Sequence, residues 1–162
     1  MPNILYISGL INQNNTMNYF AVIVAALVPM IMGMIFYHPK VMGNAWMQAN
    51  GFTVEQIKAN MPKPIMYVLT LVTSFLLASF FWAWVTGAGE TDGPQTTGPD
   101  GQNYVTFQHG LAHGLIFGIT VLLPIFASMA VFEMRSRKWA FVNILYWTLT
   151  AMVMCGILSA WR

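Results

Sequence analysis

The sequence has few charged residues. Only 7% of its 162 residues are Asp, Glu, Lys or Arg, while 57% are hydrophobic; an ordinary soluble domain carries about a quarter charged residues. This scarcity excludes a soluble helical bundle, which needs polar outer faces that repeat about every 3.6 residues. The sequence also has no nucleophile-base-acid set, phosphate-binding loop or nucleic-acid motif. We therefore expect no nucleic-acid partner, and nothing in the sequence supports an enzymatic activity.

Cysteine is almost absent as well. The single Cys155 lies inside the last apolar run, so an intrachain disulfide is excluded and cysteine usage does not indicate the compartment. Residues 1–16 have no basic start and only a short apolar run, which excludes a signal peptide. We expect them to form an outward-facing extension, with the first membrane span as the targeting signal.

Long apolar runs without Lys, Arg, Asp or Glu are what the sequence does contain. A helix of roughly 20 apolar residues crosses a hydrocarbon core of about 30 Å. Four runs reach that length, and we expect an all-α integral membrane four-helix bundle formed by residues 17–162, with spans at about 17–37, 64–86, 107–132 and 139–161.

Basic residues indicate the orientation. Six of the seven lie in the loops that join spans one to two and three to four, whereas the loop between spans two and three has three acidic residues and no basic one. By the positive-inside rule, the two basic loops face the cytoplasm and both termini lie outside. Aromatic and basic residues at the ends of the spans are then interfacial anchors: Tyr37, Pro39, Lys40, Trp46, Trp139 and Trp161.

The first basic loop has a helical pattern. Between Lys40 and Ala49 apolar residues recur on one face, and Gly51 fits the end of that helix. Thr53 and Gln56 match a capping box for a second short helix. We expect a short amphipathic helix pair on the inner face, which either rests on the headgroups or binds a partner protein.

Several ordered motifs resemble a known family. They are MNYFAVIVAAL at 17–27, FYHPKVMGNAWM at 36–47 followed by GFTVEQIK, VFEMRSRKWAFVNILYW at 131–147 and ILSAW at 157–161. Together they are similar to the bacterial four-span family called domain of unknown function 1761. The resemblance implies an integral membrane protein of the bacterial inner membrane and supplies no activity, cofactor or site residue.

Span three contains a ridge of small residues. Gly110, Gly114 and Gly118 recur at four-residue spacing, a pattern that lets membrane helices approach closely. Beside this ridge, His109 and His113 lie one turn apart on one face. Hydrogen-bonded packing, a proton-transfer or quinone-binding role, and metal binding are the three interpretations of this pair.

Depth limits the possible metal ligands. Cys155 lies six residues before Trp161, which is about 9 Å along a helix. We expect His113 to lie at a comparable depth below the outer surface of the membrane. His109, His113 and Cys155 are therefore candidate ligands of copper or zinc. Haem held by both histidines is excluded. Residues i and i+4 of one helix point the same way and cannot occupy the two opposite axial positions of a planar haem. No cofactor is required by the sequence.

Two further polar patterns concern packing. Glu133 and Arg137 are spaced for an ion pair. Polar residues recur in span two and in span four, and we expect hydrogen bonds between the two helices. These residues are Thr70, Thr73 and Ser74 in span two and Asn143, Tyr146 and Thr150 in span four.

Function is the least constrained property. The leading hypothesis is a structural or accessory subunit of a larger membrane complex, because the loops are short and no soluble domain follows the spans. The alternatives are a small oligomeric transporter or channel, and a membrane redox or metal-binding protein that uses His109 and His113. The expected partners are the lipid bilayer and either another membrane protein or further copies of the chain.

Overall fold

The structure is a computed structural model that describes residues 17–87 and 105–161. Every regular element in these two ranges is helical. Four helices are long and apolar enough to cross a membrane, namely α2 (Tyr19–Phe36), α5 (Pro64–Thr86), a helix over Phe107–Phe132, and α8 (Arg137–Ala160). The predicted all-α class is confirmed, and so are four helices with the length and apolar composition expected of the spans. The expected extension at 1–16 lies outside the described residues.

Local sequence accounts for the ends of these helices. Asn18 caps α2 by accepting a hydrogen bond from the Ala21 amide at 3.1 Å, and Ser136 caps α8 through the Trp139 amide at 3.1 Å. Both side chains satisfy a backbone N–H that has no partner within its helix. Helix α5 begins at a proline and ends at Gly87, whose φ of 64° is readily adopted only by glycine.

The predicted helix pair lies between α2 and α5. It consists of a π-helical turn η1 (Pro39–Gly43) that continues into α3 (Asn44–Asn50), and of α4 (Val54–Ala59). Gly51 ends α3 with a φ of 71°. Thr53 and Gln56 form the capping box, with hydrogen bonds of 2.9 and 3.3 Å between each side chain and the other residue's amide. The helix pair is therefore confirmed, although it starts with a π turn.

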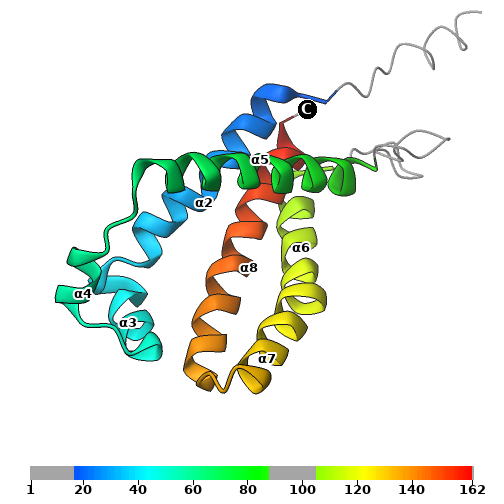
Figure 1. Ribbon diagram of the computed structural model, residues 1–162. Helices are drawn as coiled ribbons and strands as arrows, with labels where there is room; N and C mark the ends of the chain where they lie inside the picture. The colour runs from blue at the N-terminus through cyan, green and yellow to red at the C-terminus, as the bar shows by residue number, and fades with distance from the viewer. Residues whose placement is uncertain (1–16, 88–104, 162) are drawn as a thin grey trace, which may run out of the picture.

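Helix α8 is the centre of the molecule. It contacts α2, α3, α5, α6 and α7, and in Figure 1 it runs between α2 and the α6–α7 helix while α5 crosses near its C-terminal end. The largest cluster of buried residues joins α2, α5 and α8 at this end: Ala21, Val22, Ala25, Ala26, Val28, Ala78, Phe81, Val85, Ala151, Met154, Cys155 and Leu158. Small residues of α2 allow this close packing.

The third span is interrupted in its middle. It comprises α6 (Phe107–Phe117), a π-helical turn η2 (Gly118–Leu122) and α7 (Leu123–Phe132). Pro124 lies two residues after the end of the π turn, and a proline removes one backbone hydrogen bond and crowds the carbonyl four residues earlier. A wider π turn is one way for a helix to accommodate such a break.

Helix α5 packs along only half of its length. Residues 64–73 are all exposed, and its buried residues begin at Ser74. The predicted hydrogen bonds between spans two and four are absent among the described residues. Thr70 donates to the Met66 carbonyl of its own helix at 2.8 Å, and Thr150 donates to the Tyr146 carbonyl at 2.8 Å. Threonine side chains in helices can satisfy their hydroxyl on a carbonyl of the preceding turn, and both the exposed Thr70 and the buried Thr150 do so.

Candidate functional site

The start of α6 is fixed against the end of α8. Thr106 caps α6 by accepting a hydrogen bond from the His109 amide at 3.3 Å. The carbonyl of Thr106 in turn accepts one from the Ser159 hydroxyl of α8 at 2.7 Å. These two bonds set both the position and the direction of the first turn of α6, which carries the histidine pair.

The three glycines of α6 and η2 lie at the contact with α8. A Cβ atom added to Gly110 would overlap the backbone of Cys155, and one added to Gly114 would overlap the backbone of Met152. At Gly118 the obstacle is the side chain of Thr148. The two helix backbones approach this closely only because the ridge has no side chains.

His109 and His113 lie beside this ridge and contact each other. Their ring centroids are 4.5 Å apart, and the ring of Trp84 from α5 meets His113 edge to face at 5.0 Å. The Nδ1 atom of His113 is buried and has no hydrogen-bond partner among the described residues. Buried imidazole nitrogens are usually paired, so this atom is a buried polar group that the described residues leave unsatisfied.

The geometry suits two kinds of chemistry. Two neighbouring imidazoles can each provide one nitrogen to a metal ion, or can pass a proton from one ring to the other. Trp84 was not among the predicted site residues. Counting depth from the end of span two would have placed it at the level of the histidines, because α5 and α6 end and begin at the same end of the molecule.

Cys155 is not brought together with the histidines. It is a free thiol, fully buried within the core that α2, α5 and α8 form. In the part of the chain that the structure describes, no three His, Cys, Asp or Glu side chains are placed to hold a metal ion. The three-ligand site proposed from depth alone is therefore not assembled, because depth along a helix does not fix the direction in which a side chain points.

At the other end of the molecule, an aromatic cluster joins the helix pair to α2 and α8. The ring of Tyr37 lies 5.2 Å from Trp46 and 4.9 Å from Tyr146. The Tyr146 hydroxyl donates a 2.8 Å hydrogen bond to the carbonyl of Pro29. Burial, with a smaller contribution from Tyr146, raises the pKa of Tyr37 well above its ordinary value, so its hydroxyl stays protonated at neutral pH. Sequence reasoning missed Tyr146 as a contact of Pro29, since no local pattern links residues so far apart.

The remaining predicted anchors lie at the ends of the spans. Pro39 and Lys40 begin the π turn after α2, where the Lys40 amide donates to Nδ1 of His38 at 3.2 Å. Trp139 packs against Phe126 at 5.8 Å. Trp161 meets the ring of Phe20 at 5.1 Å. Their placement at a membrane interface stays a prediction.

The predicted ion pair between Glu133 and Arg137 is wrong. Glu133 pairs instead with Arg135, with 3.4 Å between Oε2 and Nε and both side chains largely exposed. The spacing of four residues pairs side chains only within a continuous helix. Helix α7 ends at Phe132 and α8 begins at Arg137, so Glu133 lies in the turn between the helices and no continuous helix holds both residues.

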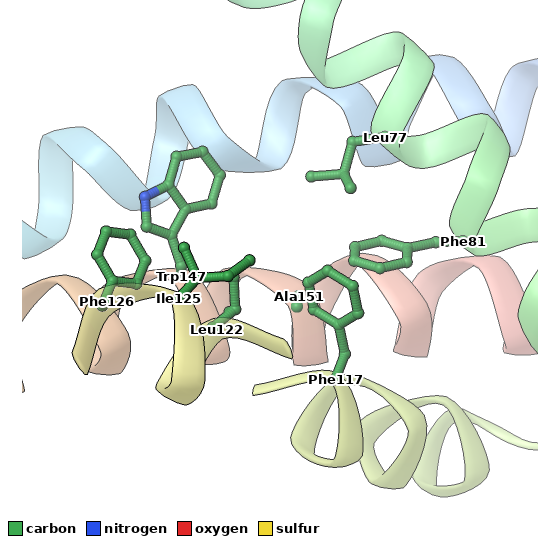
Figure 2. Close-up of a pocket in the computed structure, with 8 residues that line it drawn as sticks. All are labelled: Leu77, Phe81, Phe117, Leu122, Ile125, Phe126, Trp147 and Ala151. Atoms are coloured by element: carbon green, nitrogen blue, oxygen red, sulfur yellow. The ribbon is translucent and has the colours of Figure 1, made fainter. Parts of the chain in front are cut away.

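An apolar cavity of about 240 Å³ lies where α5 leaves the bundle. Figure 2 shows Leu77 and Phe81 of α5 on one side and residues of the third span and α8 on the other. Phe81 meets Phe117 edge to face at 5.0 Å. The lining is entirely hydrophobic and holds no titratable group: Leu77, Phe81, Phe117, Leu122, Ile125, Phe126, Trp147 and Ala151.

Comparison with known proteins identifies the family. A family model described as "Protein of unknown function (DUF1761)" matches residues 20–159, which confirms the resemblance predicted from the ordered motifs. Neither the curated proteins nor the solved structures contained a match. The matched range covers all four spans and the helix pair, and the chain belongs to the DUF1761 family of proteins of unknown function.

Proposed function

We propose that the protein is a structural or accessory subunit of a larger complex in the bacterial inner membrane. The observation that carries this proposal is the exposed half of α5. Residues 64–73 bury no side chain against the rest of the chain, whereas the second half of the same helix contributes Ala78 and Phe81 to the core. Helices in membranes associate by close packing and interhelical hydrogen bonds, and this half-helix has neither within the described residues.

The exposed half continues the wall of the apolar cavity. Met66, Thr70 and Thr73 precede Leu77 and Phe81 at spacings of three and four residues, which places all five on one face of α5. We call this face the cavity face. It begins at the cavity of Figure 2 and extends beyond it toward the start of α5.

The chemistry of the cavity face suits an apolar helix of another polypeptide. The hydroxyls of Thr70 and Thr73 donate to carbonyls of their own helix at 2.8 and 3.0 Å, so the face presents few unsatisfied polar groups. The cavity holds no charge that would bind a polar substrate. Small hydroxyl residues also permit close approach of a second helix.

Mild-detergent purification of the whole chain tests this proposal. Thr70→Trp places a bulky ring on the cavity face from an exposed position, and Phe141→Trp is the matched control because Phe141 is 60% exposed on α8 and lines none of the cavity. We expect one membrane protein to co-purify with the wild type and with Phe141→Trp, and to be reduced at least tenfold with Thr70→Trp. Elution of the wild type alone, or equal retention by both variants, would overturn the proposal.

The histidine pair favours a second candidate function, a membrane redox or metal-binding role. The observation behind it is the unpartnered Nδ1 of His113 next to the ring of His109. A visible absorption spectrum and elemental analysis of the purified protein test it. The expected result is a metal or chromophore that is lost when both histidines are replaced by Ala; a protein free of both would rule this function out.

A further inference from the structure

A second cavity lies in the helix pair, at the end of the molecule opposite to the histidines. It has a volume of about 520 Å³, within the range of about 300–1,000 Å³ that is typical of small-molecule sites. Trp46 and Phe52, whose ring centroids are 5.5 Å apart, form one wall. Ile57 and Met61 contribute further apolar surface. An apolar chain fits these walls.

Two amides give the cavity a polar edge. Gln56 lines it while its Oε1 accepts the capping hydrogen bond from the Thr53 amide at 2.9 Å. Asn60 also lines it, and its Nδ2 donates to the Gln56 carbonyl at 2.9 Å. Both side chains are held in place, and the Nε2 group of Gln56 has no partner among the described residues. This group is free to donate to an ester or phosphate oxygen.

Basic residues gather at this end of the molecule. The helix pair with its flanking turns, the turn before α8 and the first turn of α8 hold six basic residues and two acidic ones, Glu55 and Glu133, a net charge of 6 − 2 = +4. Lys58 follows the cavity residue Ile57, and Lys63 follows Pro62, which also lines the cavity. Neither lysine forms an ion pair within the described part of the chain.

Position in the fold decides the class of ligand. The helix pair connects the end of α2 to the start of α5, and both are helices of spanning length. The cavity therefore lies at the depth where acyl chains meet headgroups, and the lysines beside it favour an anionic headgroup. We propose that this cavity binds one anionic phospholipid, with an acyl chain against Trp46 and Phe52 and the phosphate next to Lys58 and Lys63.

Native mass spectrometry of the whole purified chain tests the proposal. The probes are phosphatidylglycerol and phosphatidylcholine with identical acyl chains. We expect one phosphatidylglycerol to be retained per chain, about tenfold better than phosphatidylcholine. Lys58→Gln should lower this preference about fivefold, the factor that corresponds to about 1 kcal/mol per lysine near an anionic lipid. Equal retention of the two lipids would overturn the proposal.

Two matched controls separate a site from general attraction to a basic surface. Lys40→Gln removes the same charge from the π turn, and we expect less than a twofold effect; an effect equal to that of Lys58→Gln would overturn the proposal. Met61→Trp fills the cavity from a position that is 71% exposed, and Met34→Trp adds the same ring outside it at a position 72% exposed. We expect only Met61→Trp to abolish the single-lipid peak. If the single-lipid peak persists in a folded Met61→Trp protein, the lipid does not bind in this cavity.

Discussion

Tyr146 connects two helices at the position of a proline. Its hydroxyl donates to the Pro29 carbonyl at 2.8 Å, and the closest atom to a Cβ added at Gly33 would be the same hydroxyl oxygen, at 3.5 Å. Proline in a helix interior leaves a carbonyl of the preceding turn without its usual donor. The carbonyl left in this way is that of Ala25, whereas Tyr146 bonds to the carbonyl of Pro29 itself, so the contact joins α2 to α8 next to the weakened turn.

Tyr146→Phe removes this hydrogen bond and keeps the ring. We expect the free energy of unfolding to fall by about 0.5–1.5 kcal/mol, as for other single hydrogen bonds. Thermal or denaturant unfolding in detergent measures the change. Tyr67→Phe is the control, because Tyr67 lies on the exposed half of α5. An equal change in both variants would show that the hydrogen bond to Pro29 contributes nothing.

Two glycines with different surroundings give a second prediction. A Cβ added at Gly114 would overlap the backbone of Met152, whereas at Gly33 it would meet ordinary contacts. We expect Gly114→Ala to reduce the free energy of unfolding by about 1–3 kcal/mol, the range for overpacked sites. Gly33→Ala should be neutral or slightly stabilising, since alanine favours helix more than glycine does. The reverse order would contradict the close α6–α8 contact.

The stability of the folded protein should depend on pH through the ionisation of Tyr37. Its pKa is raised in the folded protein by burial, so an unfolded chain ionises first, near pH 10. The stability that this residue contributes is present below that pH and is lost as the pH rises toward the folded pKa. We expect the thermal midpoint of the wild type to fall above pH 10, and to fall less in Tyr37→Phe. Identical curves would show that Tyr37 is not buried.

At the scale of elements, the sequence predicts most of the helices and few of their contacts. Apolar length defines the spans, and local signals such as Gly51 and the capping box define the helix pair, because these effects act within one or two turns. The π turn before Pro124, the Tyr146 contact and the pairing of Glu133 with Arg135 depend on how the chain folds back on itself. The same reason limits prediction of the candidate site. The contact between His109 and His113 follows from their spacing on one helix. The contact of Trp84 with His113, and the separation of Cys155 from both histidines, depend on how other helices pack.

The capping box is the element-scale feature most open to test. Thr53→Ala removes the side chain that accepts a hydrogen bond from the Gln56 amide. Loss of such a cap costs about 0.5–2 kcal/mol of helix stability. We expect faster hydrogen exchange in α4 and unchanged exchange in α8, measured by mass spectrometry. Unchanged exchange in α4 would show that the helix is held by other contacts.

At the scale of the whole molecule, the chain divides into a packed end and an open end. The core of α2, α5 and α8 and the glycine contact of α6 lie at the end where α8 finishes. Toward the opposite end α5 diverges, as Figure 1 shows, and α7 buries no residue. Half a helix that packs on nothing within the described residues is consistent with a fold that another chain completes, as the proposed function states.

Orientation is a second whole-molecule property. The distribution of basic residues predicts that the helix pair faces the cytoplasm. In a Cys155→Ala background, a cysteine at Lys58 should react with a membrane-impermeant maleimide only after the membrane is opened, while one at Gln102 should react in intact cells. Labelling in the opposite order would show that the topology is the reverse of the predicted one.

Site-specific photo-cross-linking tests whether the exposed half of α5 meets another protein in the membrane. A photoreactive phenylalanine analogue at Met66 lies on the cavity face of α5, and one at Phe141 serves as the exposed control. In native membranes, we expect the probe at Met66 to form an adduct with a transmembrane segment of a different protein and the probe at Phe141 to form none. Adducts with lipid alone, or with a second copy of the same chain, would contradict this expectation.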